Sequence, residues 1–278
     1  YRQKGSWDNF DPRVVLNVYP TEGVMLWASY ANGYTAGGFN SLQVGSEFDP
    51  EEVDNYELGV KSEFLDSTVR VNASVYHFVY SDKQDIIHVD NGGTVRVFTT
   101  TTGDAEGTGF ESEFLWLPME NLQLAMNYGY LDAQWTDREL QGFYNGCGAG
   151  RVDGNLDGEV LTGPRQRVSL SADYDLQLGD NGTVLFHADY SLTSKRKLNV
   201  ADSDFCANYE TKDDDFDLTN ARIAWEDPTA AWQVAVWAEN LFDTEYVVGY
   251  NSIAADLDAP YVRRNFPRMY GMEVIYKW

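Results

Sequence analysis

Residues 167–192 read RVSLSADYDLQLGDNGTVLFHADYSL and repeat with a period of two on both sides of a short turn. Apolar side chains occupy the even positions from Val168 to Leu176 and again from Val184 to Leu192, and the odd positions are mostly polar. Successive side chains of a β-strand point to opposite faces, so each half predicts a strand with one apolar and one polar face. The segment 179–182 predicts a tight turn, and the whole stretch is expected to form an antiparallel hairpin.

The same alternation recurs along almost the whole chain, for example in residues 53–65, 68–80 and 122–135. A helix would need apolar residues at three- and four-residue spacing, which these segments lack. The sequence therefore predicts an all-β protein, an antiparallel up-and-down meander of about eleven strands. The predicted strands lie near residues 11–19, 24–31, 53–65, 68–80, 95–117, 122–135, 164–178, 183–193, 214–226, 231–241 and 263–277.

The connections between these strands alternate in length. Tight turns are expected at 20–23, 66–67, 118–121, 179–182 and 227–230, and long polar stretches near 32–52, 81–94, 136–163, 194–213 and 242–262. Short turns at one end and long loops at the other are typical of outer-membrane barrels. A soluble β-sandwich would also alternate, but it has no reason to place every long loop at one end, and the four-strand repeat of a propeller is not found.

Composition narrows the classes of function. The 278 residues carry 44 acidic and 20 basic side chains, a formal net charge of −24, so no nucleic-acid partner is expected because the phosphates would not be neutralised. Aromatic residues make up 14% of the chain, too many for a disordered acidic tail. No apolar run approaches the length of a transmembrane helix, which leaves a membrane barrel open because its strands alternate.

Enzyme motifs are absent from the sequence: there is no Walker A, HExxH or GxSxG pattern. The three histidines His77, His88 and His187 lie in separate segments, so no zinc cluster is predicted. We therefore expect no catalytic residue, no enzymatic activity and no resident cofactor.

Several short motifs occur in a fixed order along residues 12–278. They are the segments 29–40 (SYANGYTAGGFN), 56–61 (YELGVK), 65–66, 76–84, 109–113 (GFESE), 129–133 (GYLDA), 239–246 (ENLFDTEY) and 267–271 (PRMYG). Together they resemble the C-terminal half of the β-barrel of TonB-dependent outer-membrane receptors, closest to the siderophore-receptor branch. The chain ends in Trp278, where that family usually ends in phenylalanine.

The resemblance implies that residues 1–278 are the C-terminal part of a 22-stranded barrel, without the plug domain and the first half of the barrel. The chain begins at Tyr1 without an initiator methionine, which also favours a piece of a longer protein. The parent protein would lie in the outer membrane of a Gram-negative bacterium and bind a scarce nutrient. The siderophore-receptor branch implies that this nutrient is a ferric siderophore. It would take up that nutrient with energy supplied by the TonB complex through the missing N-terminal plug. Further implied partners are outer-membrane lipid and the barrel-assembly machinery.

Two other functions stay open at this point. A passive porin-like channel would have the same strands and loops but no plug. A secreted acidic β-protein that binds or cleaves carbohydrate would stay soluble without detergent.

An odd number of strands has a geometric consequence. Because chain direction reverses at each hairpin, the first and the last of eleven strands run in the same direction. Single-chain bacterial barrels instead have an even number of strands. Two unpaired edges in hydrocarbon would also cost several kcal/mol for each unsatisfied backbone group. We therefore expect an open curved meander, with the strands near 11–19 and 263–277 not paired with each other.

Candidate site residues fall in three groups. Aromatic residues on the long loops have no local structural need and are the predicted ligand contacts. Alternating residues of the last strand are the predicted assembly signal. Polar residues on the other face of the strands are expected to line the lumen. The loop contacts are Tyr34, Phe39, Phe143, Tyr144, Phe205, Tyr209 and Tyr250; the assembly signal is Tyr270, Met272, Val274, Tyr276 and Trp278; the lumen residues are Glu57, Lys61, Glu63, Arg70, Glu111, Glu113, Arg167, Asp173 and Glu273.

Two further predictions concern loops. Asp153, Asn155 and Asp157 have the alternate spacing of Ca²⁺ ligands, although the twelfth position is Pro164 rather than glutamate and excludes an EF-hand. The family's own loop pattern accounts for half of this motif, so an ordinary loop is the alternative. Cys147 and Cys206 lie in neighbouring long loops at the same predicted outer end, and they predict either a disulfide or two unpaired side chains.

Overall fold

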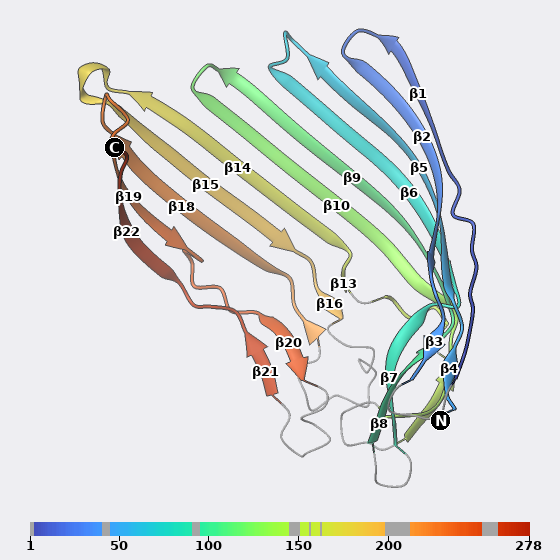
Figure 1. The fold of residues 1–278 in the computed structure, drawn as a ribbon. Coiled ribbons are helices and arrows are strands. Elements are labelled where there is room, and N and C mark those ends of the chain that lie inside the picture. Colours follow the sequence, from blue (N-terminus) through green and yellow to red (C-terminus); the bar gives the residue numbers. More distant parts are fainter. Residues whose placement is uncertain are drawn as a thin grey trace.

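The computed structural model describes residues 3–40, 45–90, 95–144, 151–155, 157–161, 163–197, 212–251 and 261–278. Eleven strands form one sheet in which each strand pairs with its neighbours in antiparallel orientation (Figure 1). Within the described ranges the helical structure is a single 3₁₀ turn, Gly179–Asn181, and no helix there is long and apolar enough to cross a membrane. In order across the sheet the strands are β1 (Arg13–Thr21), β2 (Val24–Thr35), β5 (Glu51–Phe64), β6 (Val69–Ser81), β9 (Asp104–Met119), β10 (Leu122–Asp137), β14 (Gln166–Gln177), β15 (Thr183–Thr193), β18 (Phe216–Glu226), β19 (Trp232–Glu239) and β22 (Met269–Tyr276).

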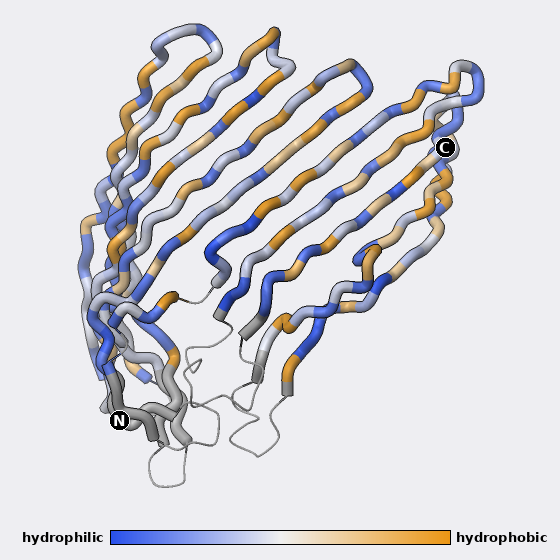
Figure 2. Tube along the Cα trace, turned by 180° about the vertical axis from the view of Figure 1, so that it is seen from behind, coloured by the Kyte–Doolittle hydropathy of each residue, from blue (hydrophilic) through white to orange (hydrophobic). Residues whose placement is uncertain are grey.

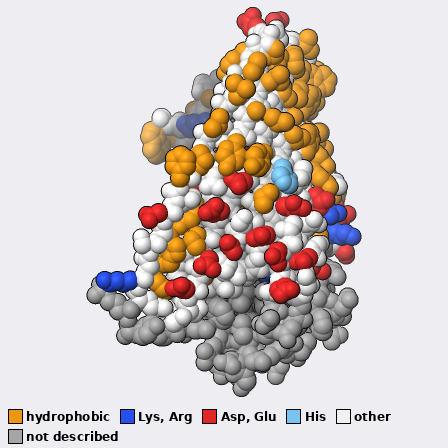
Figure 3. All heavy atoms as spheres, turned by 90° about the vertical axis from the view of Figure 1, so that its right-hand side faces the viewer, with side chains coloured by type: hydrophobic (Ala, Val, Ile, Leu, Met, Phe, Trp, Pro, Cys, Tyr) orange, Lys and Arg blue, Asp and Glu red, His pale blue; other side chains and the backbone are white. Residues whose placement is uncertain are grey.

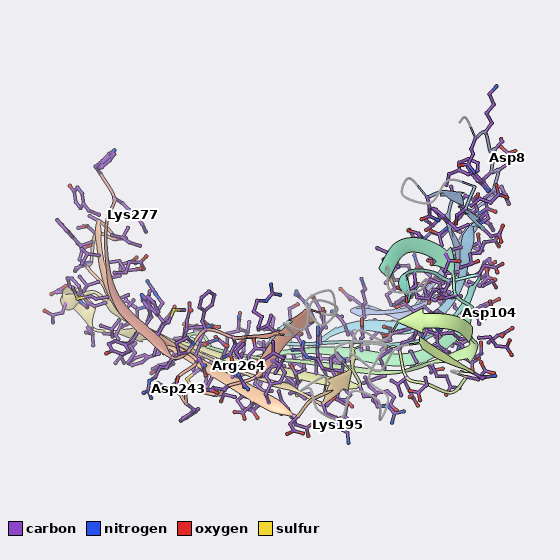
Figure 4. All side chains as sticks on the ribbon, turned by 90° about the horizontal axis from the view of Figure 1, so that it is seen from below. Asp8, Asp104, Lys195, Asp243, Arg264 and Lys277 are labelled. Carbon is purple, nitrogen blue, oxygen red and sulfur yellow. The ribbon has the colours of Figure 1, made fainter. Side chains whose placement is uncertain are left out.

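The sheet is curved and open. Seen from the loop end, it forms a crescent whose two ends carry Asp8 and Lys277 (Figure 4). β1 and β22 are the two edge strands and do not pair with each other. This confirms the predicted meander of eleven strands and the predicted lack of pairing between the first and last.

The two ends of the sheet differ as predicted. Tight turns join the strands at one end, and all the long connections lie at the other, where short strands form four small sheets (Figure 1). The largest has the order β12-β11-β7-β8 and folds over the concave side of the main sheet (Figure 4). The short strands are β3 (Gly38–Phe39), β4 (Glu47–Phe48), β7 (Gln84–Asp90), β8 (Val95–Thr101), β11 (Glu139–Tyr144), β12 (Arg151–Asn155), β13 (Gly163–Pro164), β16 (Arg196–Lys197), β17 (Lys212–Asp213), β20 (Val247–Asn251) and β21 (Tyr261–Arg264).

Two predicted strands are wrong in extent. The strand expected near 95–117 is two strands, β8 and β9, because the chain turns sharply at Gly103, whose φ is 134°. There the backbone N–H of Lys83 donates to the Gly103 carbonyl at 2.8 Å, and β8 leaves the main sheet to pair with β7. The strand expected near 263–277 is β21 followed by β22, with residues 265–268 between them outside any strand.

The pairing register assigns each side chain to a face. Leu16, Ala28, Leu58 and Val75 stand opposite one another across β1, β2, β5 and β6, and so share one face. Hydrophobic and hydrophilic residues alternate along the strands in this way throughout the sheet (Figure 2). Hydrophobic side chains cover much of the convex face seen in Figure 3, as expected for a surface in contact with lipid.

The concave face is polar. The register places the predicted lumen residues together on it, and several of them form pairs there. Arg70 bonds Glu63 at 2.7 Å and Arg222 bonds Glu273 at 3.0 Å, and His187 Nδ1 lies 2.7 Å from Asp173. Four of the nine predicted lumen residues therefore have an ion-pair partner on the wall itself, which for these four favours a solvated polar interior over free ligand contacts.

Asp227 closes the tight turn between β18 and β19. One oxygen accepts the Thr229 hydroxyl at 2.6 Å and the other accepts the Trp232 N–H at 2.7 Å. These bonds, the Thr229 hydroxyl first, lower the pKa of Asp227. An aspartate whose pKa is lowered in the folded protein stabilises the fold at pH values above its unfolded-state pKa of about 3.9. This stabilisation is lost as the pH falls through that value and then through the lower pKa of the folded state.

We expect Asp227→Asn to lower the melting temperature of the complete protein at pH 7 and to flatten its decline between neutral pH and about pH 3. Thermal unfolding measured across this range is the test. Asp180→Asn removes the same charge from the neighbouring tight turn and serves as the control. A pH profile of Asp227→Asn that is parallel to the wild type would contradict this role of Asp227.

Candidate functional site

The candidate site is the loop end of the concave face, where three long connections fold together; we call it the rim. Asn40, after β3, pairs with the backbone of Thr99 in β8 through both ends of its amide, each at 2.8 Å. The Gln84 side chain donates to the carbonyl oxygens of Ala36 at 3.1 Å and Asp49 at 2.9 Å. These bonds join the β2–β5 connection to the β6–β9 connection.

Arg138 joins the third connection to the other two. It lies between β10 and β11, is only 1% exposed, and stacks on the Trp135 ring with its guanidinium carbon 3.8 Å from the ring centroid. Its Nη2 bonds Asp85 of β7 at 3.1 Å, and its backbone N–H donates to Asp157 at 2.7 Å. Arg138 therefore anchors the four-stranded sheet of the rim to the wall.

The surroundings of Arg138 are unusual for a cation. Burial lowers the pKa of Arg138, and the Asp85 carboxylate opposes this shift. Its Nε and Nη1 atoms are buried and have no hydrogen-bond partner. Since an uncompensated buried charge is costly, the single carboxylate of Asp85 is the essential counter-charge.

A second guanidinium–aromatic cluster lies further along the rim. The rings of Phe216 and Tyr246 stack with centroids 3.9 Å apart, and Arg196 lies 5.4 Å and 5.9 Å from their centroids. Arg196 also donates to the Val247 carbonyl at 2.7 Å. The rim thus holds two guanidinium groups against aromatic rings. Arg138 and Trp135 are buried, whereas Arg196, Phe216 and Tyr246 are partly exposed, an arrangement suited to anionic or π-rich ligands.

The motif at 239–246 has a structural role in this cluster. Asn240, with φ at 49°, accepts the Thr244 N–H at 2.8 Å and donates to the Thr244 carbonyl at 2.9 Å. Asp243 accepts the Arg268 N–H at 2.7 Å, which ties the loop to the chain before β22. The motif therefore forms the turn that brings Tyr246 onto Phe216.

The predicted ligand contacts are only partly within the described structure. Tyr34 stands opposite Glu52 on the convex face, and its hydroxyl is buried without a partner. Phe39 packs against Trp7 with ring centroids 5.6 Å apart, at the outer end of β3. Neither lies beside Arg138 or Arg196 in any described contact. The side chains of Phe143, Tyr144, Phe205, Tyr209 and Tyr250 lie outside the described residues, and the ligand role of all seven stays a prediction.

The calcium prediction also stays open. The backbone N–H of Asp157 donates to the Asn155 side chain at 2.7 Å, and the Asn155 amide donates back to Asp157 at 2.9 Å. The other Asp157 oxygen accepts the Arg138 N–H, so these side chains hold the rim loop through hydrogen bonds to one another and to the backbone. The Asp153 side chain lies outside the described residues, and no cluster of three metal-binding acidic, histidine or cysteine side chains occurs in the part that is described.

The predicted assembly signal lies on the exposed outer face of β22. Tyr270, Met272, Val274 and Tyr276 are at least half exposed, and Trp278 is fully exposed at the chain end. Their partners on β19, among them Val234 and Val236, are apolar as well. The placement is compatible with recognition of this strand, which stays a prediction.

Cys147 and Cys206 lie outside the described residues. We expect them to form a disulfide that restrains the two loops and adds about 2–4 kcal/mol of stability. Mass spectrometry of non-reduced peptides from the complete protein tests this. Cysteines that both alkylate without a reductant, or Cα atoms more than about 7 Å apart in an experimental structure, would exclude the bond.

The sequence did not single out Arg138, Arg196, Asn40 or Gln84, which organise the rim. A charged residue after a predicted strand is ordinarily solvent-exposed, so the sequence holds no signal for Arg138 or Arg196. Asn40 and Gln84 lie in segments that resemble the family, but their backbone contacts depend on how the loops fold together.

The amino-acid sequence matches one family model and several known proteins. The family model described as "TonB dependent receptor-like, beta-barrel" matches residues 1–241. The metal-pseudopaline receptor CntO of Pseudomonas aeruginosa is 28% identical over 208 residues, which cover 68% of this chain and 28% of that protein. The ferrichrome outer membrane transporter/phage receptor of Escherichia coli is 26% identical over 235 residues, 84% of this chain and 28% of the relative.

Solved structures agree in fold. The ferric yersiniabactin uptake receptor FyuA of Yersinia pestis superposes with a TM-score of 0.69 at 18% identity, covering 95% of this chain and 36% of that one. The ferric preacinetobactin receptor BauA of Acinetobacter baumannii gives a TM-score of 0.65 at 19% identity, with 96% and 36% covered. The chain thus spans about a third or less of the length of the proteins it matches.

Proposed function

Because the chain belongs to the family of TonB-dependent receptor-like β-barrels of the Gram-negative outer membrane, we propose that it forms the C-terminal wall of a nutrient receptor. In this proposal the missing parts are the plug and the first half of a 22-stranded barrel. The receptor binds a ferric siderophore or a similar metal chelate at its loop end, and the TonB complex drives uptake through the plug. No covalent chemistry is part of the cycle.

The observation that carries the proposal is the open eleven-stranded wall with an organised rim on its concave side. A wall with two unpaired edges needs further strands to satisfy its backbone in lipid. The partly exposed Arg196–Phe216–Tyr246 cluster offers cationic and aromatic surface where an anionic chelate would arrive, and the buried Arg138–Trp135 stack holds the rim in place beside it. The relatives named for pseudopaline and ferrichrome support a metal-chelate ligand.

Uptake of radioactive iron tests the proposal. A strain that lacks the receptor is compared with the same strain carrying the complete gene, with and without functional TonB. The probes are Fe(III) complexes of hydroxamate, catecholate and carboxylate chelators. We expect accumulation of at least one complex that requires both the receptor and TonB.

Two outcomes would favour the alternatives. Passage of small solutes without TonB would indicate a porin-like channel. A protein that remains soluble without detergent during cell fractionation would indicate a secreted β-protein.

A further inference from the structure

We draw no further inference here: the strongest candidate, the hollow on the concave face around Gly129 between Glu111 and Arg167, lies on the lumen side of the wall, where a plug as its occupant would restate an established property of the family and nothing in the structure shows any other group that covers it.

Discussion

An Asp85→Asn variant of the complete receptor should open the rim, with amide hydrogen exchange in β7 and β8 about 30-fold faster than in the wild type. The substitution leaves the buried Arg138 guanidinium without its counter-charge, and Arg138 already has two nitrogen atoms, Nε and Nη1, without a hydrogen-bond partner. Removing one partner of a buried ion pair costs about 3–5 kcal/mol; since Asp85 is one-third exposed, we expect about 2 kcal/mol. A loss of about 2 kcal/mol raises the equilibrium constant for local opening about 30-fold, and hydrogen exchange accelerates by the same factor.

Two further variants make this prediction specific. Asp132→Asn breaks the ion pair with Arg165, in which both side chains are about half exposed, and should change exchange in the rim little. Combining Asp85→Asn with Arg138→Leu removes the uncompensated charge and should restore much of the protection. Unchanged exchange in Asp85→Asn, or no recovery in the double variant, would show that Arg138 does not anchor the rim.

Gly103→Ala adds one methyl group and should destabilise the rim more than any other such addition there, by about 3 kcal/mol or more. Gly103 has a φ of 134°, a backbone conformation that residues with a side chain rarely adopt. A Cβ there would also overlap the carbonyl oxygen of Asp137. Because the obstructing atom is backbone, β9 and β10 must separate locally. We expect a folded barrel with a displaced rim, measured as normal heat-modifiable migration on gels but strongly reduced chelate binding.

The control is Gly129→Ala on the wall of β10. A Cβ at Gly129 meets nothing within 4 Å, so its effect should stay within about 0.5 kcal/mol. If Gly103→Ala bound ligand like the wild type, the turn at Gly103 would not position the rim.

The wall could be predicted from the sequence because its physics is local. In β14, Val168 to Leu176 alternate with polar residues, and the observed register keeps the two sets on separate faces. The tight turns also carry their own signals, such as Gly179, which begins the 3₁₀ turn before β15, and Gly182, which follows it. A one-residue slip would move every apolar side chain to the polar face, so alternation determines the register as well as the strand.

The rim could not be predicted in the same way because its contacts join distant segments. Arg138 and Asp85 are 53 residues apart, and Asn40 and Thr99 are 59 apart. The alternating pattern does not reveal the turn at Gly103, because the residues before and after it both form strands. The motif containing Asn240 was recognised, but its role as the turn beneath Tyr246 depends on geometry that only the fold supplies.

Cross-linking in the complete receptor tests the central claim, that this chain is an open wall whose edges meet other strands. Cysteine pairs are placed at the loop ends of strands, in a background without the native cysteines, and treated with a short bis-methanethiosulfonate reagent. Arg13→Cys with Ala31→Cys, and Glu239→Cys with Met269→Cys, join register partners and should cross-link. Arg13→Cys with Met269→Cys joins β1 to β22 and should not; a cross-link as efficient as in the two control pairs would mean a closed eleven-stranded ring and would contradict the account.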